Sequence, residues 1–230
     1  MSSTNTSFTS IPILDFSLTK SPTTRDAFLS QLRDSLINVG FLYLSNHTVS
    51  SGVIDTLLEY IPKLFALPQE AKDDITMANS EHFLGYSRLG KELTKGKVDR
   101  REQFDIATPH ISRWKEGDPD YYRLWGPSQV SSCRATKPIL TEVQWPSEDL
   151  IPGFRSVFEQ YLNQVQDLSN QFSSLIAESF GLGPEGFAGF YDPPEKMQHR
   201  AKIVQYPITR NGSDQGVGPH YDAGFLTFVR

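Results

Sequence analysis

Two residues near the C-terminus, His220 and Asp222, are separated by a single residue in the segment GPHYDAGFLTF. Alternate side chains of an extended strand project from the same face, so this spacing would bring the imidazole and the carboxylate together. A histidine and a carboxylate on a common face are two of the three groups in the facial two-histidine-one-carboxylate arrangement that holds Fe(II). The pair is therefore a candidate metal site.

Taken alone, an H-x-D triplet is weak evidence for a metal, because most histidines are not ligands. With five histidines and 27 acidic residues in the chain, roughly half an H-x-[DE] triplet is expected by chance. Two other interpretations therefore stay open at this point. The pair could be structural, or it could belong to a zinc-binding module, although no further ligands with recognisable zinc spacing accompany it.

The elements that must position this pair are predicted from hydrophobic periodicity and turn residues. Helices are expected over residues 24–39, 51–65, 68–74 and 153–180. Strands are expected over residues 11–16, 41–47, 202–206, 218–222 and 226–229. The charged, glycine-punctuated stretch 85–106 is interpreted as a solvated loop leading into a strand. The order of elements indicates an α+β fold with an all-β unit that begins at the C-terminal end.

Composition excludes several classes of protein. The net charge of −5 gives no electrostatic reason to expect binding to nucleic acid or to an anionic membrane. The lone cysteine, Cys133, cannot form an internal disulfide, and the polar N-terminus MSSTNTSFTS does not have the pattern of a secretory signal. No apolar stretch approaches bilayer length. We therefore expect a soluble cytoplasmic protein; the oligomeric state is left open.

Several segments resemble the isopenicillin N synthase-like group of Fe(II)/2-oxoglutarate-dependent dioxygenases. GVGPHYDAGFLTF is similar to the group's G-x-x-x-H-x-D-x-G-x-L-T, and GFLYLSNHTV is similar to its G-F-x-x-x-x-N-H-G-V, with Thr48 where glycine is usual. The segments IPILDFS, LGYSRLGKE, REQFDI, PGFR and KIVQYP also fit. The resemblance therefore covers nearly the whole chain.

This resemblance implies an N-terminal mixed α/β region and a long helix that lead into a double-stranded β-helix, or jelly-roll, core. It implies an oxidoreductase that uses Fe(II), 2-oxoglutarate and O2 to hydroxylate, desaturate or cyclise a small organic molecule. His220 and Asp222 take the positions of metal ligands. Tyr206 falls where some members place a tyrosine that hydrogen-bonds cosubstrate or substrate; a buried tyrosine with a routine hydrogen bond is the alternative. His47 is interpreted as structural.

Two groups of the family pattern are missing from the sequence. The family's third ligand is a histidine about fifty to sixty residues after the H-x-D, and an arginine that pairs with 2-oxoglutarate follows it. Only eight residues follow Asp222. We therefore expect an incomplete, truncated jelly roll and an inactive chain, with His199 as the one substitute ligand considered. The alternative is a non-catalytic fragment or pseudoenzyme that acts as a binding or regulatory protein.

An insertion separates two motifs that are contiguous in the family, which has G-P-N-x-W-P without interruption. Here residues 130–144 lie between GPSQ and Trp145. The codons for Val-Ser and Val-Gln at its ends can match intron boundaries, and we hypothesise that the segment is translated intron sequence. The expected organisation is a disordered tail at 1–10, an N-terminal dioxygenase region at 11–127, an irregular insert at 128–150, and the long helix with the first jelly-roll strands at 151–230.

Overall fold

The computed structural model of the chain describes residues 9–80, 82–108, 110–124, 145–193, 196–208, 216–222 and 224–230. The expected insert 130–144, with Cys133, and most of the predicted tail at 1–10 lie outside these ranges. Two compact units are formed by Met1–Ser51 with Asn163–Asp192 and by Gly52–Leu162 with Pro193–Arg230. Within the ranges described, no helix is long and apolar enough to cross a bilayer.

The first unit is built around a parallel strand pair, β1 (Ile13–Asp15) and β2 (Tyr43–Ser45). After β1 the chain forms the short helix η1 (Phe16–Lys20) and then α1 (Pro22–Asn38). Gly40 closes α1 with a φ of +88° and donates its N–H to the carbonyl of Ser35 at 3.0 Å. Glycine tolerates this left-handed conformation. The predicted helix and its stop are confirmed.

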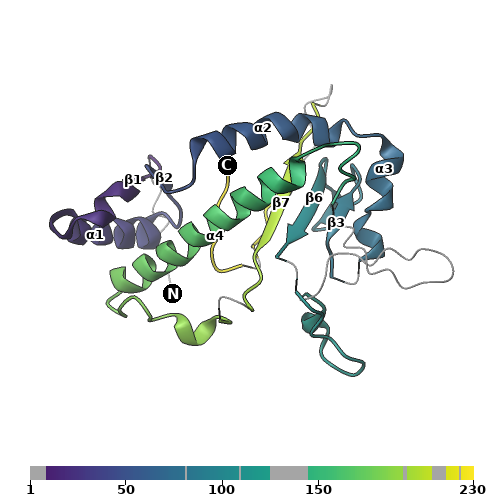
Figure 1. The fold of residues 1–230 in the computed structure, drawn as a ribbon. Coiled ribbons are helices and arrows are strands. Elements are labelled where there is room, and N and C mark those ends of the chain that lie inside the picture. Colours follow the sequence, from purple (N-terminus) through teal and green to yellow (C-terminus); the bar gives the residue numbers. More distant parts are fainter. Residues whose placement is uncertain are drawn as a thin grey trace. The chain divides into compact units, whose positions relative to one another are not determined.

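The second unit contains an antiparallel sheet of three strands in the order β3-β6-β7 (Figure 1). The strands are β3 (Gly85–Ser87), β6 (Glu102–Ala107) and β7 (Arg200–Gln205). In the register of the sheet, Tyr86 lies opposite Phe104, and Phe104 lies opposite Ile203. These three side chains therefore share one face of the sheet, and all three are buried.

Two helices pack on this face, α2 (Ser51–Phe65) and the first turns of α4 (Phe154–Ser179). The ring of Phe65 meets that of Phe104 edge-on at 5.5 Å between centroids, and Trp145 meets Phe158 in the same way at 5.6 Å. Full burial of one such side chain stabilises the fold by roughly 1.5–3 kcal/mol. The helices therefore cover one face of the sheet, and strand alternation turns residues such as Asp105 to the other face.

The charged stretch before β6 is more ordered than the solvated loop we expected. Strands β4 (Leu93–Thr94) and β5 (Lys97–Val98) form a hairpin. Its turn residues Lys95 and Gly96 both have positive φ, which is the geometry of a type I′ turn. At the base of the hairpin the fully buried Asp99 accepts a hydrogen bond from the Thr94 hydroxyl at 2.7 Å. Short helices occupy four other segments, α3 (Gln69–Asp74), η2 (Met77–Asn79), η3 (Asp120–Leu124) and η4 (Ala188–Phe190).

The strands predicted at 218–222 and 226–229 are wrong, because both segments are irregular. A strand needs a neighbour to accept and donate its backbone hydrogen bonds. Among the residues that the structure describes, β7 pairs with β6 alone, and no strand pairs with the segment 216–230. Three large apolar side chains of this segment are exposed, with Tyr221 at 100%, Val229 at 90% and Phe225 at 59%.

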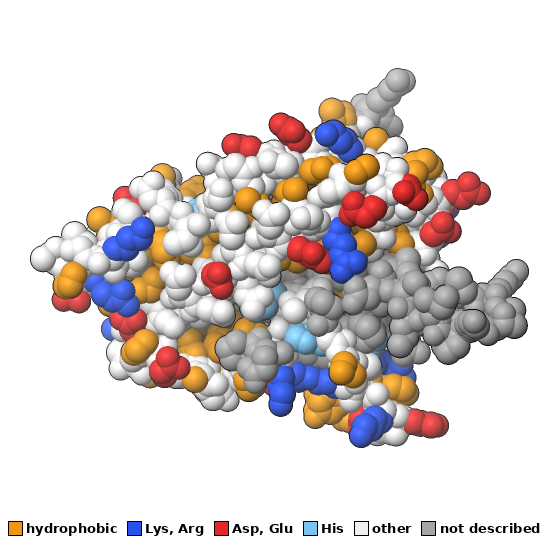
Figure 2. Space-filling view, in the orientation of Figure 1, with side chains coloured by type: hydrophobic (Ala, Val, Ile, Leu, Met, Phe, Trp, Pro, Cys, Tyr) orange, Lys and Arg blue, Asp and Glu red, His pale blue; other side chains and the backbone are white. Residues whose placement is uncertain are grey.

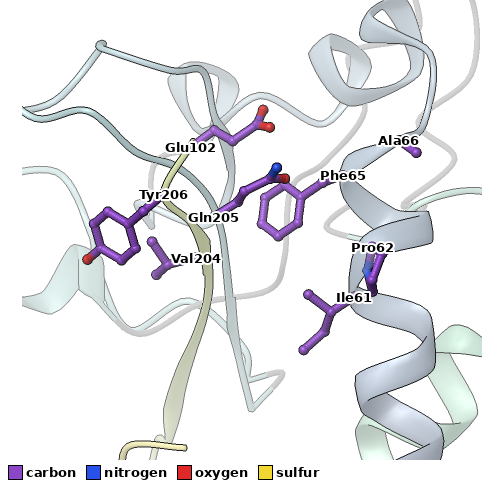
Figure 3. Close-up of a pocket in the computed structure, with 8 residues that line it drawn as sticks. All are labelled: Ile61, Pro62, Phe65, Ala66, Glu102, Val204, Gln205 and Tyr206. Atoms are coloured by element: carbon purple, nitrogen blue, oxygen red, sulfur yellow. The ribbon is translucent and has the colours of Figure 1, made fainter. Parts of the chain in front are cut away.

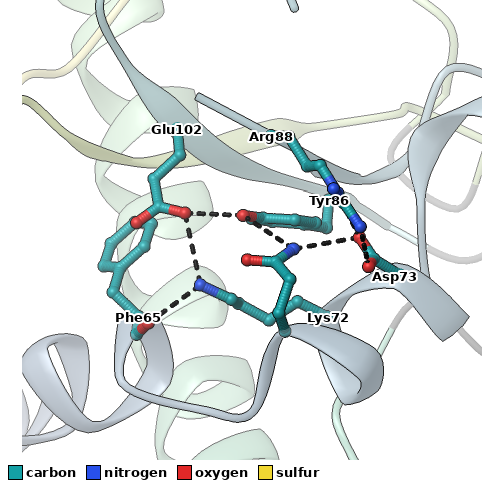
Figure 4. A network of polar contacts seen from close by, with 7 residues as sticks. Phe65, Lys72, Asp73, Tyr86, Arg88 and Glu102 are labelled. Atoms are coloured by element: carbon teal, nitrogen blue, oxygen red, sulfur yellow. Dashed lines mark hydrogen bonds and ion pairs between the residues drawn. The ribbon is translucent and has the colours of Figure 1, made fainter. Parts of the chain in front are cut away.

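A polar network beneath the sheet joins α3 to β3 and β6 (Figure 4). The Tyr86 hydroxyl donates to Glu102 Oε2 at 2.6 Å. The ammonium of Lys72, which is buried, lies 3.3 Å from the same oxygen and donates to the carbonyl of Phe65 at 3.0 Å. Because both partners of the Glu102 carboxylate are withdrawn from water, this network fixes the position of α3 against the sheet.

We expect Tyr86 to make stability depend on alkaline pH. Burial, and then the hydrogen bond to Glu102, raise the pKa of Tyr86 to about 12, whereas an unfolded tyrosine ionises near pH 10. Between pH 10 and about pH 12 the unfolded chain binds fewer protons than the folded chain, so the free energy of unfolding falls as pH rises. The fall due to Tyr86 should total at most about 2–3 kcal/mol. Tyr86→Phe should leave only the falls due to other tyrosines whose pKa burial raises, such as Tyr161 and Tyr191.

Denaturant unfolding at a series of pH values from 9 to 12 measures this slope. Tyr43→Phe is the matched control, since the Tyr43 side chain is 60% exposed. If Tyr86→Phe and Tyr43→Phe lose stability with pH in parallel, the Tyr86 hydroxyl is not held as the structure places it.

Candidate functional site

His220 and Asp222 are brought together in the structure, although not by a strand. His220 Nε2 lies 3.4 Å from Asp222 Oδ1. His220 Nδ1 lies 2.8 Å from the carbonyl oxygen of Gly218, and a carbonyl only accepts hydrogen bonds, so Nδ1 carries the hydrogen. A neutral ring in this tautomer has its lone pair on Nε2, the atom that faces the carboxylate.

This geometry fits two ligands of one ion. Two donor atoms that each lie about 2.1 Å from an ion and at right angles are about 3 Å apart, close to the observed separation. The Asp222 carboxylate is also oriented, because Oδ2 accepts a hydrogen bond from the Thr227 hydroxyl at 3.1 Å. Hydrogen bonds that orient ligands in this way are typical of metal sites. Imidazole nitrogen and carboxylate oxygen are donors that suit Fe(II).

The pair is open to solvent and lacks a third partner in the part of the chain that the structure describes. The side chains are 46% and 56% exposed. No three His, Cys, Asp or Glu residues come together within the described ranges. All five histidines lie in those ranges, so His199, the substitute ligand considered above, does not complete a three-group site with the pair.

The other histidines have structural contacts. His47 Nδ1 accepts the backbone N–H of Val49 at 3.3 Å, as the structural interpretation predicts. His82 Nδ1 donates to the carbonyl of Arg123 at 2.6 Å, and His110 Nε2 donates to that of Met197 at 2.9 Å. Burial, followed by the neighbouring His110, lowers the pKa of His199. The His199 imidazole is half-buried, and its surroundings favour the neutral form.

Tyr206 follows directly after β7 and is 51% exposed, so the alternative of a buried tyrosine is wrong. In Figure 3 its ring points away from α2, whereas the neighbouring Gln205 points toward Phe65 of α2. A Cβ atom placed on Gly216 would lie only 3.0 Å from the Tyr206 ring. The absence of a side chain at Gly216 therefore lets the segment that leads to His220 rest against Tyr206.

A hollow of about 510 Å³ lies where β7 meets α2 (Figure 3). Its lining is mostly apolar, with Glu102, Gln205 and Tyr206 as the polar exceptions; the apolar members are Ile61, Pro62, Phe65, Ala66 and Val204. Volumes of this order are usual for small-molecule sites. The hollow therefore places Tyr206 at the rim of a space that could hold an organic molecule.

A second polar group lies on the face of the sheet that is turned away from the helices, and the sequence analysis did not predict it. Asp105 lies directly opposite Lys202 in the ladder, and their charged atoms are 3.5 Å apart. Gln103 donates to the Asp105 carboxylate at 2.7 Å. The alternation in REQFDI and KIVQYP could have identified the face, but the register that pairs the two charges depends on tertiary structure.

The surface carries charges of both signs. On the face shown in Figure 2, acidic and basic side chains are intermixed and do not form a patch of one sign. This agrees with the net charge of −5, which comes from 27 acidic and 22 basic residues.

Comparison with known proteins gives the family. The family model described as "non-haem dioxygenase in morphine synthesis N-terminal" matches residues 11–133, which is more than half of the chain. The chain is 42% identical over 227 residues to the 2-oxoglutarate-dependent dioxygenase frbJ of Dothideomycetidae sp. (strain 11243), a match that covers 97% of this chain and 56% of the relative. A 2-oxoglutarate-dependent dioxygenase of Gibberella zeae is 35% identical, over 96% of this chain and 55% of its own length.

Solved structures show the same fold. The crystal structure of a full-length Neurospora crassa protein in complex with alpha-KG and thymine superposes with a TM-score of 0.69 at 21% identity, and covers 93% of this chain and 62% of that protein. This chain spans about half the length of the curated relatives it matches. The family model and the relatives confirm the resemblance that the motifs indicate. The chain belongs to the family of Fe(II)- and 2-oxoglutarate-dependent dioxygenases.

Proposed function

We propose that His220 and Asp222 are two of the metal ligands of an oxidoreductase that hydroxylates, desaturates or cyclises a small organic molecule. The observation that carries this proposal is the approach of the free His220 Nε2 to Asp222 Oδ1 at 3.4 Å. Membership of an enzyme family whose relatives are named 2-oxoglutarate-dependent dioxygenases supports it. When bound, Fe(II) with 2-oxoglutarate would supply the activation of O2.

The chain's own residues have three roles in this proposal. The carbonyl of Gly218 holds the His220 ring with Nε2 free, and the hydroxyl of Thr227 orients the Asp222 carboxylate. Tyr206, at the rim of the hollow, offers a hydroxyl that can hydrogen-bond cosubstrate or substrate.

We further propose that the 230 residues by themselves bind metal weakly and do not turn over. Two exposed ligands cannot fix a closed coordination site, and a catalytic site needs supporting contacts on every side. The irregular segment at 216–230 and the single neighbour of β7 within the described residues agree with a jelly roll that is incomplete in this chain. The alternative is a non-catalytic binding or regulatory protein.

Metal titration of the 230-residue chain tests the ligand assignment. Calorimetry with Fe(II) under anaerobic conditions should show one weak site, and His220→Ala should weaken it by about tenfold or more. Fe(II)-dependent decarboxylation of 2-oxoglutarate by the same preparation should be undetectable, because the site is not closed.

His47→Ala is the matched control. His47 belongs to the first unit, whereas His220 belongs to the second, and the His47 imidazole contacts the backbone of Val49. Equal metal affinity in His220→Ala and His47→Ala would overturn the ligand assignment. Robust decarboxylation that His220→Ala abolishes would overturn the proposal of inactivity and leave the metal site standing.

We also propose that residues 130–144 are translated intron sequence. The support is the sequence alone: the segment interrupts a motif that is contiguous in the family, and fifteen codons preserve the reading frame. Sequencing of transcripts across this region should find most messages without the segment. If most messages retain it, residues 130–144 are a genuine insertion.

A further inference from the structure

We propose that the Asp105–Lys202 pair binds the charged end of a zwitterionic substrate such as an α-amino acid, with the substrate's ammonium on Asp105 and its carboxylate on Lys202. This inference rests on the proposed function, because it names the substrate class of the same site. It is carried by four observations: which face the pair occupies, how each charge is compensated, what holds the pair in place, and an acceptor that has no partner.

The pair lies on the same face of the sheet as Tyr206. Lys202, Val204 and Tyr206 alternate along one side of β7 and its extension, and Asp105 is opposite Lys202 in the ladder. Gly216 rests against the Tyr206 ring, four residues before His220. Asp105 and Lys202 therefore lie on the same face of the sheet as Tyr206, the residue that the segment leading to His220 contacts.

Neither charge of the pair is fully compensated by the other. Their atoms are 3.5 Å apart, longer than a good charge-assisted hydrogen bond. An ammonium has three donors, and the Lys202 side chain is 40% exposed, so donors remain for a ligand. The Asp105 side chain is only 14% exposed, and its burial raises the pKa of that carboxyl despite Lys202. Both groups would gain from a further partner of opposite charge.

The charges around the pair favour a ligand that carries both signs. A lone carboxylate on Lys202 would lie close to Asp105, and a lone cation on Asp105 would lie close to Lys202, so each would meet a like charge. A zwitterion aligned head-to-tail with the pair satisfies both groups and adds no net charge. An α-amino acid carries its two charges on adjacent carbons at a separation of this order.

The Asp105 carboxylate is held by a buried chain of polar contacts. Gln103, which is 1% exposed, donates to Asp105 Oδ2 and to Glu92 Oε1, each at 2.7 Å. Glu92 accepts from Arg101 at 2.7 Å, and Arg101 lies 3.3 Å from the fully buried Asp99. A cross-strand ion pair that served stability alone would contribute little and would not need this support.

Gln103 also presents an acceptor that the described protein atoms leave without a partner. Because its amide nitrogen donates to two carboxylates, the orientation of the amide is fixed. The other end, Oε1, is buried and has no hydrogen-bond partner within the described residues. An acceptor beside Asp105 would be stabilised by an N–H donor, which is what the ammonium of an amino acid brings.

Matched amino-acid probes test the proposal without metal. L-leucine has both charges, N-acetyl-L-leucine has the carboxylate alone, and L-leucinamide has the ammonium alone. Titration of the 230-residue chain, followed by the NMR signals of Lys202 and its neighbours, should give saturable binding of L-leucine and about tenfold weaker binding of each blocked probe.

The variants should respond in a crossed pattern. Lys202→Met should abolish the preference for L-leucine over L-leucinamide and keep the preference over N-acetyl-L-leucine. Asp105→Asn should do the reverse. Lys202→Arg should retain both preferences, and the exposed Lys97→Met in the β4–β5 hairpin should change nothing. If the Asp105–Lys202 pair were merely structural, each substitution in it would weaken the binding of all three probes alike.

Two results would overturn the proposal: equal affinity for the three probes, or L-leucine binding that Lys202→Met leaves unchanged. The metal titration separates this failure from failure of the proposed function. Metal binding that depends on His220 together with no zwitterion preference would refute the substrate class alone. A zwitterion preference without metal binding at His220 would refute the metal assignment and leave the Asp105–Lys202 site standing.

Discussion

The candidate site depends on the packing of two helices against one face of a small sheet. Phe104 and Ile203 are buried beneath α2 and the start of α4, and this burial fixes which way β6 and β7 face. Strand alternation then turns Asp105 and Lys202 to the opposite face. A slip of one residue in either strand would exchange the apolar and polar sets. The hydrophobic core therefore decides which side chains are available for chemistry.

Much of this framework is predictable from local sequence. The helix expected at 51–65 is α2 with the same bounds, and the segment KIVQY lies almost entirely in β7. Apolar periodicity specifies these elements because their buried faces are long and regular. The β4–β5 hairpin was missed because its turn, Lys95-Gly96, lacks the usual Asn-Gly or Asp-Gly signature. The polar network around Glu102 needs partners distant in sequence, which no local pattern gives.

The metal pair shows a different relation between sequence and structure. Its two side chains were expected to meet because a strand would place them on one face, and the strand does not form. They meet nevertheless, since the carbonyl of Gly218 holds the His220 ring and Thr227 holds the Asp222 carboxylate. Local hydrogen bonds therefore pre-order the pair, whereas the strand ladder requires neighbours that the described residues do not supply.

The central claim is that His220 and Asp222 hold iron, in the segment whose Gly216 contacts the ring of Tyr206. Metal-catalysed oxidation tests it most directly: Fe(II) with ascorbate and O2 marks the residues nearest the bound ion, and peptide mass spectrometry locates the marks. We predict oxidation concentrated at Tyr206 and within 216–222, and its loss in His220→Ala. Oxidation centred on His110 or His199, or a pattern that His220→Ala leaves unchanged, would contradict the account.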